Sequence, residues 1–133
     1  MLKLALNAEL SSLTTMADAI EGYAADHAVP RDKTMELILA LDEVLTNVIS
    51  YSGLAPGDTI AVTICLGDDA ISATVEDHGS AFDPLGDAPP PVMGSLDDRP
   101  MGGLGLHIVR TIMKESSYQR VDGRNRLLMR LPL

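Results

Sequence analysis

Two segments of alternating apolar and polar residues, separated by only three residues, place the strongest constraint on how this chain folds. They span about residues 59–66 and 70–77, and a repeat of two is the period of a β-strand. The apolar positions of the two segments are Ile60, Val62, Ile64 and Leu66, followed by Ile71, Ala73 and Val75. The connecting residues Gly-Asp-Asp are typical of a hairpin turn. The sequence therefore predicts two strands joined as a hairpin.

Helical and strand patterns on both sides of this hairpin define the fold class. Alternating leucines predict a strand over residues 2–6, and helical periodicity predicts helices from Asn7 or Ser11 to about His27 and from about Arg31 to Tyr51. After a long proline-containing loop, the patterns predict a helix over about 104–114 and strands over about 117–121 and 126–131, the latter two joined by a turn at Asp-Gly-Arg-Asn. This order predicts an α+β two-layer sandwich with a mixed, mostly antiparallel sheet and helices on one face.

Length and composition narrow the classes of protein that remain. A chain of 133 residues suits one domain with one core, so residues 1–133 are interpreted as a single domain. A net charge of −9 argues against nucleic-acid binding, and the single Cys65 excludes a disulfide framework. We expect Cys65 to be a small core residue. The N-terminal segment is too soon polar for a signal peptide and no apolar run spans a bilayer, so a cytoplasmic protein with no membrane partner is predicted.

A glycine-rich stretch, RPMGGLGLHIVR at residues 99–110, opens directly into the predicted third helix. It matches neither the dinucleotide-binding fingerprint nor the P-loop, because the third glycine of the first and the Gly-Lys-Ser/Thr of the second are absent. Helix N-termini attract anions, and glycines let a phosphate approach the backbone closely. No acidic residue occurs between Arg99 and Arg110, which favours an anion there. The alternative interpretation is a hinge or a tight turn.

Two further pairs of residues have a spacing that is typical of a functional site. Glu43 and Asn47 lie one helical turn apart and leave the same helix face, where an amide oxygen suits Mg²⁺ and a carboxylate suits a general base. They are also explained as part of the polar stripe of an amphipathic helix. Asp77 and Gly79 end a predicted strand, where a carboxylate can accept the amino proton of adenine. An ordinary turn explains these two residues equally well.

Taken together, the order of these motifs resembles the GHKL (Bergerat-fold) ATPase superfamily. The sequences DHGSAFDPL and RPMGGLGLHIVR, with Gly-Arg-Asn before the last strand, resemble its branch of anti-sigma factor serine/threonine kinases. The resemblance implies Asn47 as the Mg²⁺ ligand, Glu43 as the catalytic base, and Asp77 and Gly79 as adenine contacts. It also implies an ATP lid over about 80–101. The resemblance assigns hinge and phosphate contacts to Gly102, Gly103 and Gly105, and packing beneath them to Leu104 and Leu106. His78, within the Asp-x-Gly motif, and Lys114 depart from the branch's usual residues.

The resemblance further implies a function. The chain is expected to bind ATP and Mg²⁺, to phosphorylate a Ser or Thr of a STAS-domain anti-anti-sigma antagonist, and to sequester a sigma factor; a homodimer is also implied. The alternative hypothesis is a non-catalytic, nucleotide-dependent binding switch of the same fold. Glu43 favours the kinase. A complete sensor histidine kinase is excluded because a His-bearing dimerisation domain is missing, and no feature supports a small-molecule ATPase.

Overall fold

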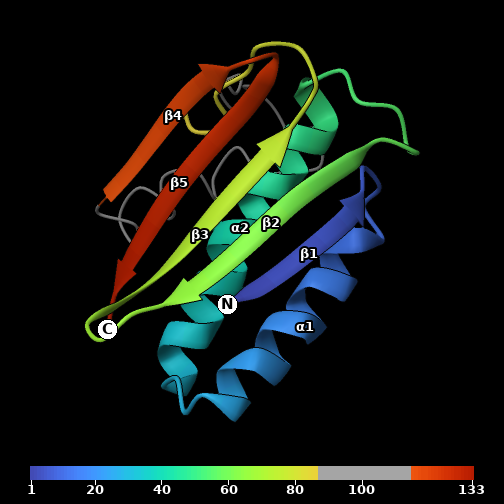
Figure 1. The fold of residues 1–133 in the computed structure, drawn as a ribbon. Coiled ribbons are helices and arrows are strands. Elements are labelled where there is room, and N and C mark those ends of the chain that lie inside the picture. The colour runs from blue at the N-terminus through green and yellow to red at the C-terminus, as the bar shows by residue number, and fades with distance from the viewer. Residues whose placement is uncertain (87–114) are drawn as a thin grey trace, which may run out of the picture.

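The structure, a computed structural model, describes residues 1–86 and 115–133 as one sheet covered by helices (Figure 1). The strands are β1 (Leu2–Asn7), β2 (Thr59–Leu66), β3 (Ala70–Asp77), β4 (Glu115–Val121) and β5 (Arg124–Pro132), and their order in the sheet is β1-β2-β3-β5-β4. Each neighbouring pair is antiparallel. The helices α1 (Ser12–Asp26) and α2 (Arg31–Tyr51) lie on the same face of the sheet. The predicted α+β two-layer architecture is confirmed, and the described strands include no parallel pair.

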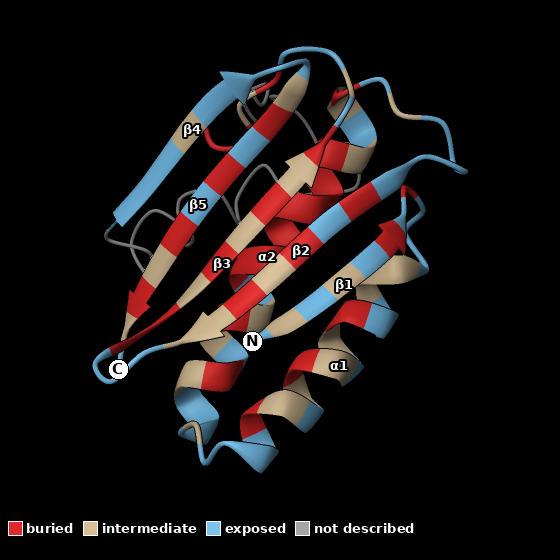
Figure 2. Cartoon of the chain, in the orientation of Figure 1, coloured by how far each residue is buried: buried red, intermediate tan, exposed pale blue. Residues whose placement is uncertain are grey.

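The hydrophobic core lies between the helices and one face of the sheet. Along β2, β3 and β5 the side chains alternate between buried and more exposed positions, as the banding in Figure 2 shows. The buried positions are apolar in the middle of each strand and meet the apolar face of α2, in agreement with a period of two against a period of 3.6. The largest fully buried side chains include Met16, Ile20, Leu41, Ile64 and Met129.

Helix α2 is the longest described element and the one that carries candidate site residues. Pro30 precedes it with an extended backbone, which suits a helix start, and Asp32 in the first turn is favourable at the positive end of the helix dipole. Its last residues pack under the segment that follows β3, where Ser80 N donates to the Ser52 carbonyl oxygen at 2.8 Å. This contact brings the end of β3 next to the end of α2.

The last hairpin is tighter than the sequence predicts. The predicted turn contained Arg124 and Asn125, but in the structure only Asp122 and Gly123 form it, and Val121 pairs with Arg124. Both turn residues have positive φ, 51° and 76°, as a two-residue type I′ turn requires. As a result β5 begins two residues earlier than predicted, and Asn125 belongs to the strand.

The expectation for Cys65 was wrong. It is half-buried and lies on the sheet face that points away from the helices, because Ile64, its neighbour in β2, occupies the inward position. The predicted helix at 104–114 lies outside the described residues. Among residues 1–86 and 115–133, neither helix combines the length and the apolar character needed to cross a bilayer.

Candidate active site

Helix α2 buries both residues of its predicted site. Glu43 is 8% exposed and Asn47 is 1% exposed, whereas Asp42 and Ser50 on the same helix are exposed. The polar residues of α2 therefore do not form one solvated stripe. Glu43 and Asn47 lie on the part of the helix that faces the interior, and burial of a carboxylate without compensation is unfavourable. Their position needs a reason other than solubility.

Glu43 is the one side chain, among the described residues, with a buried polar atom that lacks a hydrogen-bond partner. This atom is Oε1. Burial raises the pKa of the Glu43 carboxyl, and the neighbouring Asp42 carboxylate raises it further. A carboxylate with a raised pKa is a stronger proton acceptor when ionised, and an unpartnered oxygen is available to a ligand. These properties are those of a general base.

Asn47 is oriented by the segment that follows β3. Its amide nitrogen Nδ2 donates to the carbonyl oxygen of Pro84 at 3.3 Å. The amide nitrogen is therefore held by the protein, and a cation would be met by the amide oxygen. Hard cations such as Mg²⁺ prefer oxygen ligands and keep several waters. One amide oxygen from the protein is therefore sufficient when phosphate oxygens and waters supply the other ligands. The described residues contain no group of three or more His, Cys, Asp or Glu side chains that could hold a metal.

Asp77 ends β3 on the helix-facing side of the sheet and is 2% exposed. Its Oδ1 accepts two hydrogen bonds, from the backbone N–H of Gly79 at 2.8 Å and from Nδ2 of Asn125 at 2.9 Å. Both donors reach the same oxygen. The carboxylate is therefore held in one orientation, and Oδ2 is the oxygen left for a ligand.

The close packing of the backbone explains why residue 79 is a glycine. A Cβ added at this position would lie 2.3 Å from the carbonyl oxygen of Ser52 and 3.0 Å from Oδ1 of Asp77. Only glycine permits the chain leaving β3 to pass this close to the end of α2. The predicted contact between Gly79 and adenine remains a prediction.

Asn125 is the residue that sequence reasoning missed. It is 2% exposed and occupies the inward position of β5 opposite Asp77. Its Nδ2 donates to Asp77 and also to the carbonyl oxygen of Ser80 at 2.7 Å. The available signal was the alternation of β5, because Asn125 continues the buried series Leu127, Met129 and Leu131 by one step of two. Placing the turn over Arg124 and Asn125 concealed this signal.

Segment 79–85 connects the two halves of the candidate site. It contacts Asn125 on β5 through Ser80 and Phe82, and Asn47 on α2 through Pro84. The ring of Phe82 packs against Tyr51 at a centroid distance of 5.9 Å. Glu43, Asn47, Asp77 and Gly79 thus belong to one connected region. The other predicted contacts, Gly102, Gly103, Leu104, Gly105 and Leu106, lie outside the described residues, as does most of the predicted lid.

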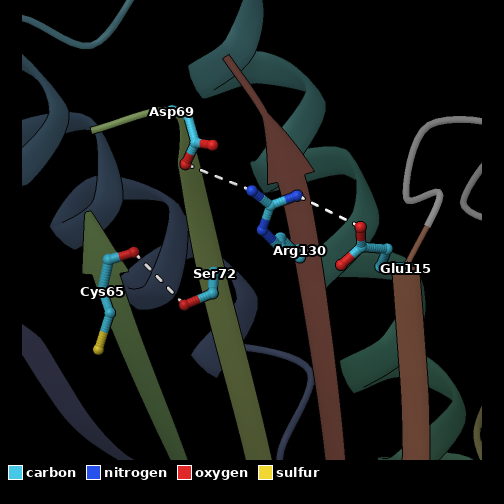
Figure 3. A network of polar contacts seen from close by, with 5 residues as sticks. All are labelled: Cys65, Asp69, Ser72, Glu115 and Arg130. Carbon is cyan, nitrogen blue, oxygen red and sulfur yellow. Dashed lines mark hydrogen bonds and ion pairs between the residues drawn. The ribbon is translucent and has the colours of Figure 1, made fainter. Parts of the chain in front are cut away.

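A pocket of about 580 Å³ lies elsewhere, at the opposite end of the sheet on the face away from the helices. Figure 3 shows five of its lining residues, with Arg130 between two carboxylates: Asp69 at 3.3 Å and Glu115 at 3.4 Å. The described residues of this pocket therefore offer no excess positive charge to a triphosphate. Ser72 in the same pocket donates to the Cys65 carbonyl oxygen. Of the predicted site residues, the four that the structure describes, Glu43, Asn47, Asp77 and Gly79, do not line it.

Comparison with known families identifies the class of protein. Residues 6–131 match the family described as the histidine kinase-like ATPase domain, and the chain belongs to this family. The match covers both candidate residues of α2, Asp77 and the glycine-rich stretch. The predicted GHKL resemblance is confirmed.

Individual relatives place the chain in the serine/threonine kinase branch of this family. It is 37% identical over 129 residues to the serine/threonine-protein kinase BtrW of Bordetella bronchiseptica, covering 91% of this chain and 89% of BtrW. It is 29% identical to the serine-protein kinase RsbW of Bacillus licheniformis over 112 residues, covering 78% of this chain and 68% of RsbW.

Two solved structures share the fold. One contains the RsbU and RsbW domains of a Mycobacterium tuberculosis protein, with a TM-score of 0.68 and 15% identity over 98% of this chain. This chain covers only 32% of that longer protein. The other is the SiaB–SiaC complex of Pseudomonas aeruginosa, with a TM-score of 0.63, 16% identity, and coverage of 100% of this chain and 90% of that one. At these identities the likeness shows the fold alone.

Proposed function

We propose that this chain is an ATP-dependent protein serine/threonine kinase of an anti-sigma partner-switching system. Its substrate is a Ser or Thr hydroxyl on a STAS-type anti-anti-sigma protein, and it sequesters a sigma factor through another surface. The names of the relatives BtrW and RsbW support the kinase assignment. The observation that carries the proposal is the buried Oε1 of Glu43, which lacks a hydrogen-bond partner and lies one helical turn from Asn47.

Glu43 acts as the general base in this mechanism. Its carboxylate takes the proton of the substrate hydroxyl while the hydroxyl oxygen forms a bond to the γ-phosphorus of ATP. The bond from that phosphorus to the β–γ bridging oxygen breaks, and ADP leaves. Positioning and electrostatic stabilisation supply most of the rate enhancement in such reactions, so the fixed place of Glu43 on a long helix matters as much as its pKa.

Asn47 and Asp77 bind the nucleotide at its two ends. Asn47 would hold Mg²⁺ through its amide oxygen, and the ion supplies neutralisation of phosphate charge when bound. Asp77 would accept a hydrogen bond from the amino group of adenine, a bond to a charged group worth about 1.5–3 kcal/mol. Gly79 lies beside it, and Gly102, Gly103, Leu104, Gly105 and Leu106 would complete the phosphate contacts and the base of the lid. A cytoplasmic homodimer is part of the same proposal.

The test mixes the pure protein with Mg²⁺, γ-labelled ATP and each STAS-domain protein of the same organism. Glu43→Gln is compared with Glu36→Gln, a matched change on the same helix about two turns earlier. The wild type and Glu36→Gln are expected to label a Ser or Thr of one candidate. Glu43→Gln is expected to lose at least about 100-fold in rate, as general-base removal does.

The controls separate binding from transfer. ATP binding is measured by calorimetry for the wild type, Glu43→Gln and Asp77→Ala, and only Asp77→Ala is expected to lose it. Nucleotide binding without transfer to any partner would favour the alternative function, a nucleotide-dependent protein-binding switch. Equal transfer by Glu43→Gln and the wild type would reject Glu43 as the base.

A further inference from the structure

Asn125 makes more side-chain hydrogen bonds than any other described residue of the candidate site. Its Nδ2 donates to Asp77 and to the Ser80 carbonyl oxygen, and its Oδ1 accepts from Phe82 N at 3.1 Å, from the Tyr118 hydroxyl and from Arg120 at 3.2 Å. The donors on Oδ1 and the acceptors on Nδ2 settle which end of the amide is which. The Asn125 side chain therefore cannot rotate by half a turn without losing most of its bonds.

This fixed amide controls the orientation of residue 77. Asn125 Nδ2 and Gly79 N both donate to Oδ1 of Asp77, so any group at that place must be an acceptor. The atom at the Oδ2 place is then the one left for a ligand. The buried donors beside Oδ1 thus decide what the other end of the side chain presents.

We propose that Asn125 is a positioning residue that determines the base preference of this site, because it fixes which atom of residue 77 faces the purine. The inference rests on the proposed function, in which Asp77 contacts adenine. It adds that the preference belongs to the pair formed by Asp77 and Asn125, with Asn125 acting through Asp77 and not through the nucleotide.

The proposal predicts an unusual result for the variant Asp77→Asn. The new amide must place its oxygen at the Oδ1 position, because both neighbours there are donors, and its NH₂ group then faces the base. A donor at that place repels the amino group of adenine and donates a hydrogen bond to the 6-carbonyl oxygen of hypoxanthine. The variant therefore changes its preference from ATP to ITP, in place of a simple loss of binding.

Exchanging the two residues reverses the effect. In the double variant Asp77→Asn with Asn125→Asp, the carboxylate at 125 accepts a charge-assisted hydrogen bond from the NH₂ of the amide at 77. This bond competes with the Gly79 N–H, which still donates at the Oδ1 place, and turns the amide oxygen toward the base. Arg120, 3.2 Å from Oδ1 of Asn125, supports a carboxylate at that position. The exchange retains the size and the total charge of the pair and moves the preference back toward ATP.

The experiment measures ATP and ITP affinities by calorimetry for the wild type, Asp77→Asn, the exchanged double variant, and Asp77→Asn combined with Tyr118→Phe. Tyr118→Phe is the matched control, because it removes one hydrogen bond to Asn125 and leaves the donor to residue 77 in place. Thermal unfolding of each variant checks the fold. The ratio of ITP to ATP affinity is a readout that general loss of stability does not change.

We expect the ratio to rise at least about tenfold in Asp77→Asn, to stay raised with Tyr118→Phe, and to return toward the wild-type value in the exchanged variant. If the wild type binds ATP but the ratio of ITP to ATP affinity is the same in Asp77→Asn and in the exchanged variant, this inference is overturned. The proposed function is then left intact. A folded Asp77→Asn that binds neither nucleotide also overturns it. A wild type that binds no ATP overturns both.

Discussion

At the scale of single residues, the site combines one buried side chain that lacks a hydrogen bond with another whose hydrogen bonds are complete. Glu43 is buried with an oxygen that has no hydrogen-bond partner among the described residues, whereas Asn125 uses both ends of its amide. Burying a polar group without a hydrogen bond destabilises the folded state, so Glu43 lowers stability, while in the proposed function it provides a base. Sites that need such groups commonly trade stability for activity.

The stability of Glu43→Gln tests this trade. The pKa of Glu43 is raised in the folded protein, so the folded state binds its proton more tightly than the unfolded state. Stability therefore falls as pH rises from the unfolded pKa through the folded one, and at neutral pH ionised Glu43 is destabilising. We expect Glu43→Gln to have a higher free energy of unfolding than the wild type at neutral pH. The gain should shrink as pH falls through the raised pKa of folded Glu43 and should be lost below the ordinary glutamate pKa.

Urea unfolding at a series of pH values measures this difference. Glu36→Gln is the control, since Glu36 is partly exposed and its ion pair with Lys33 is of the surface type. Its effect should stay within about 0.5 kcal/mol. A Glu43→Gln variant less stable than the wild type at neutral pH would contradict the assigned cause of the raised pKa.

At the scale of elements, the packing of segment 79–85 on α2 gives the candidate site its shape. The segment leaves β3 and contacts Ser52 at the end of α2. Further along it, the carbonyl oxygen of Pro84 accepts a hydrogen bond from the Asn47 side chain. Two parts of the chain far apart in the sequence are thereby held together by one backbone hydrogen bond and one from a side chain. Gly79 is the position where this approach is closest.

Two glycine substitutions should have opposite effects on stability. Gly79→Ala places a Cβ 2.3 Å from a backbone oxygen and should lower the free energy of unfolding by about 1–3 kcal/mol. Gly22→Ala, inside α1 with open space around it, should raise it by about 0.5–1 kcal/mol. Thermal and urea unfolding of both variants check this pair. Similar effects of the two would mean that the close approach at Ser52 is not maintained in solution.

At the scale of the whole molecule, one face of the sheet carries the core. Met129 and Leu128 are neighbours in β5, yet Met129 is fully buried against the helices and Leu128 is 43% exposed on the other face. Two layers suffice because the helices need to cover only one side of an antiparallel sheet.

This difference between the two faces predicts that substitutions at adjacent residues change the free energy of unfolding by very different amounts. Met129→Ala should lower the free energy of unfolding by about 2–5 kcal/mol, because it leaves a cavity in the core. Leu128→Ala should change it by no more than about 0.5 kcal/mol. Denaturant unfolding with an unchanged m-value is the measurement. Comparable losses in both variants would show that the outer face of the sheet is covered in solution.

Much of the fold could be predicted from the sequence because its signals are local. The period of two over residues 59–66 and 70–77, and the helical period over 31–51, are properties of neighbouring residues, and each element formed where it was predicted. The turn at Asp122 and Gly123 was predicted two residues too long, since the sequence Gly-Arg-Asn alone does not show which residues pair. That small error concealed Asn125.

The sequence by itself determined the described elements, the fold class and the candidate pairs Glu43–Asn47 and Asp77–Gly79, because helical and strand periods act over a few residues. Only the tertiary structure decided that Glu43 is buried without a partner and that β5 lies between β3 and β4. It also decided that Asn125 donates to Asp77, 48 residues earlier in the chain. Such contacts depend on which surfaces meet when the sheet and helices pack, and no local pattern contains that information.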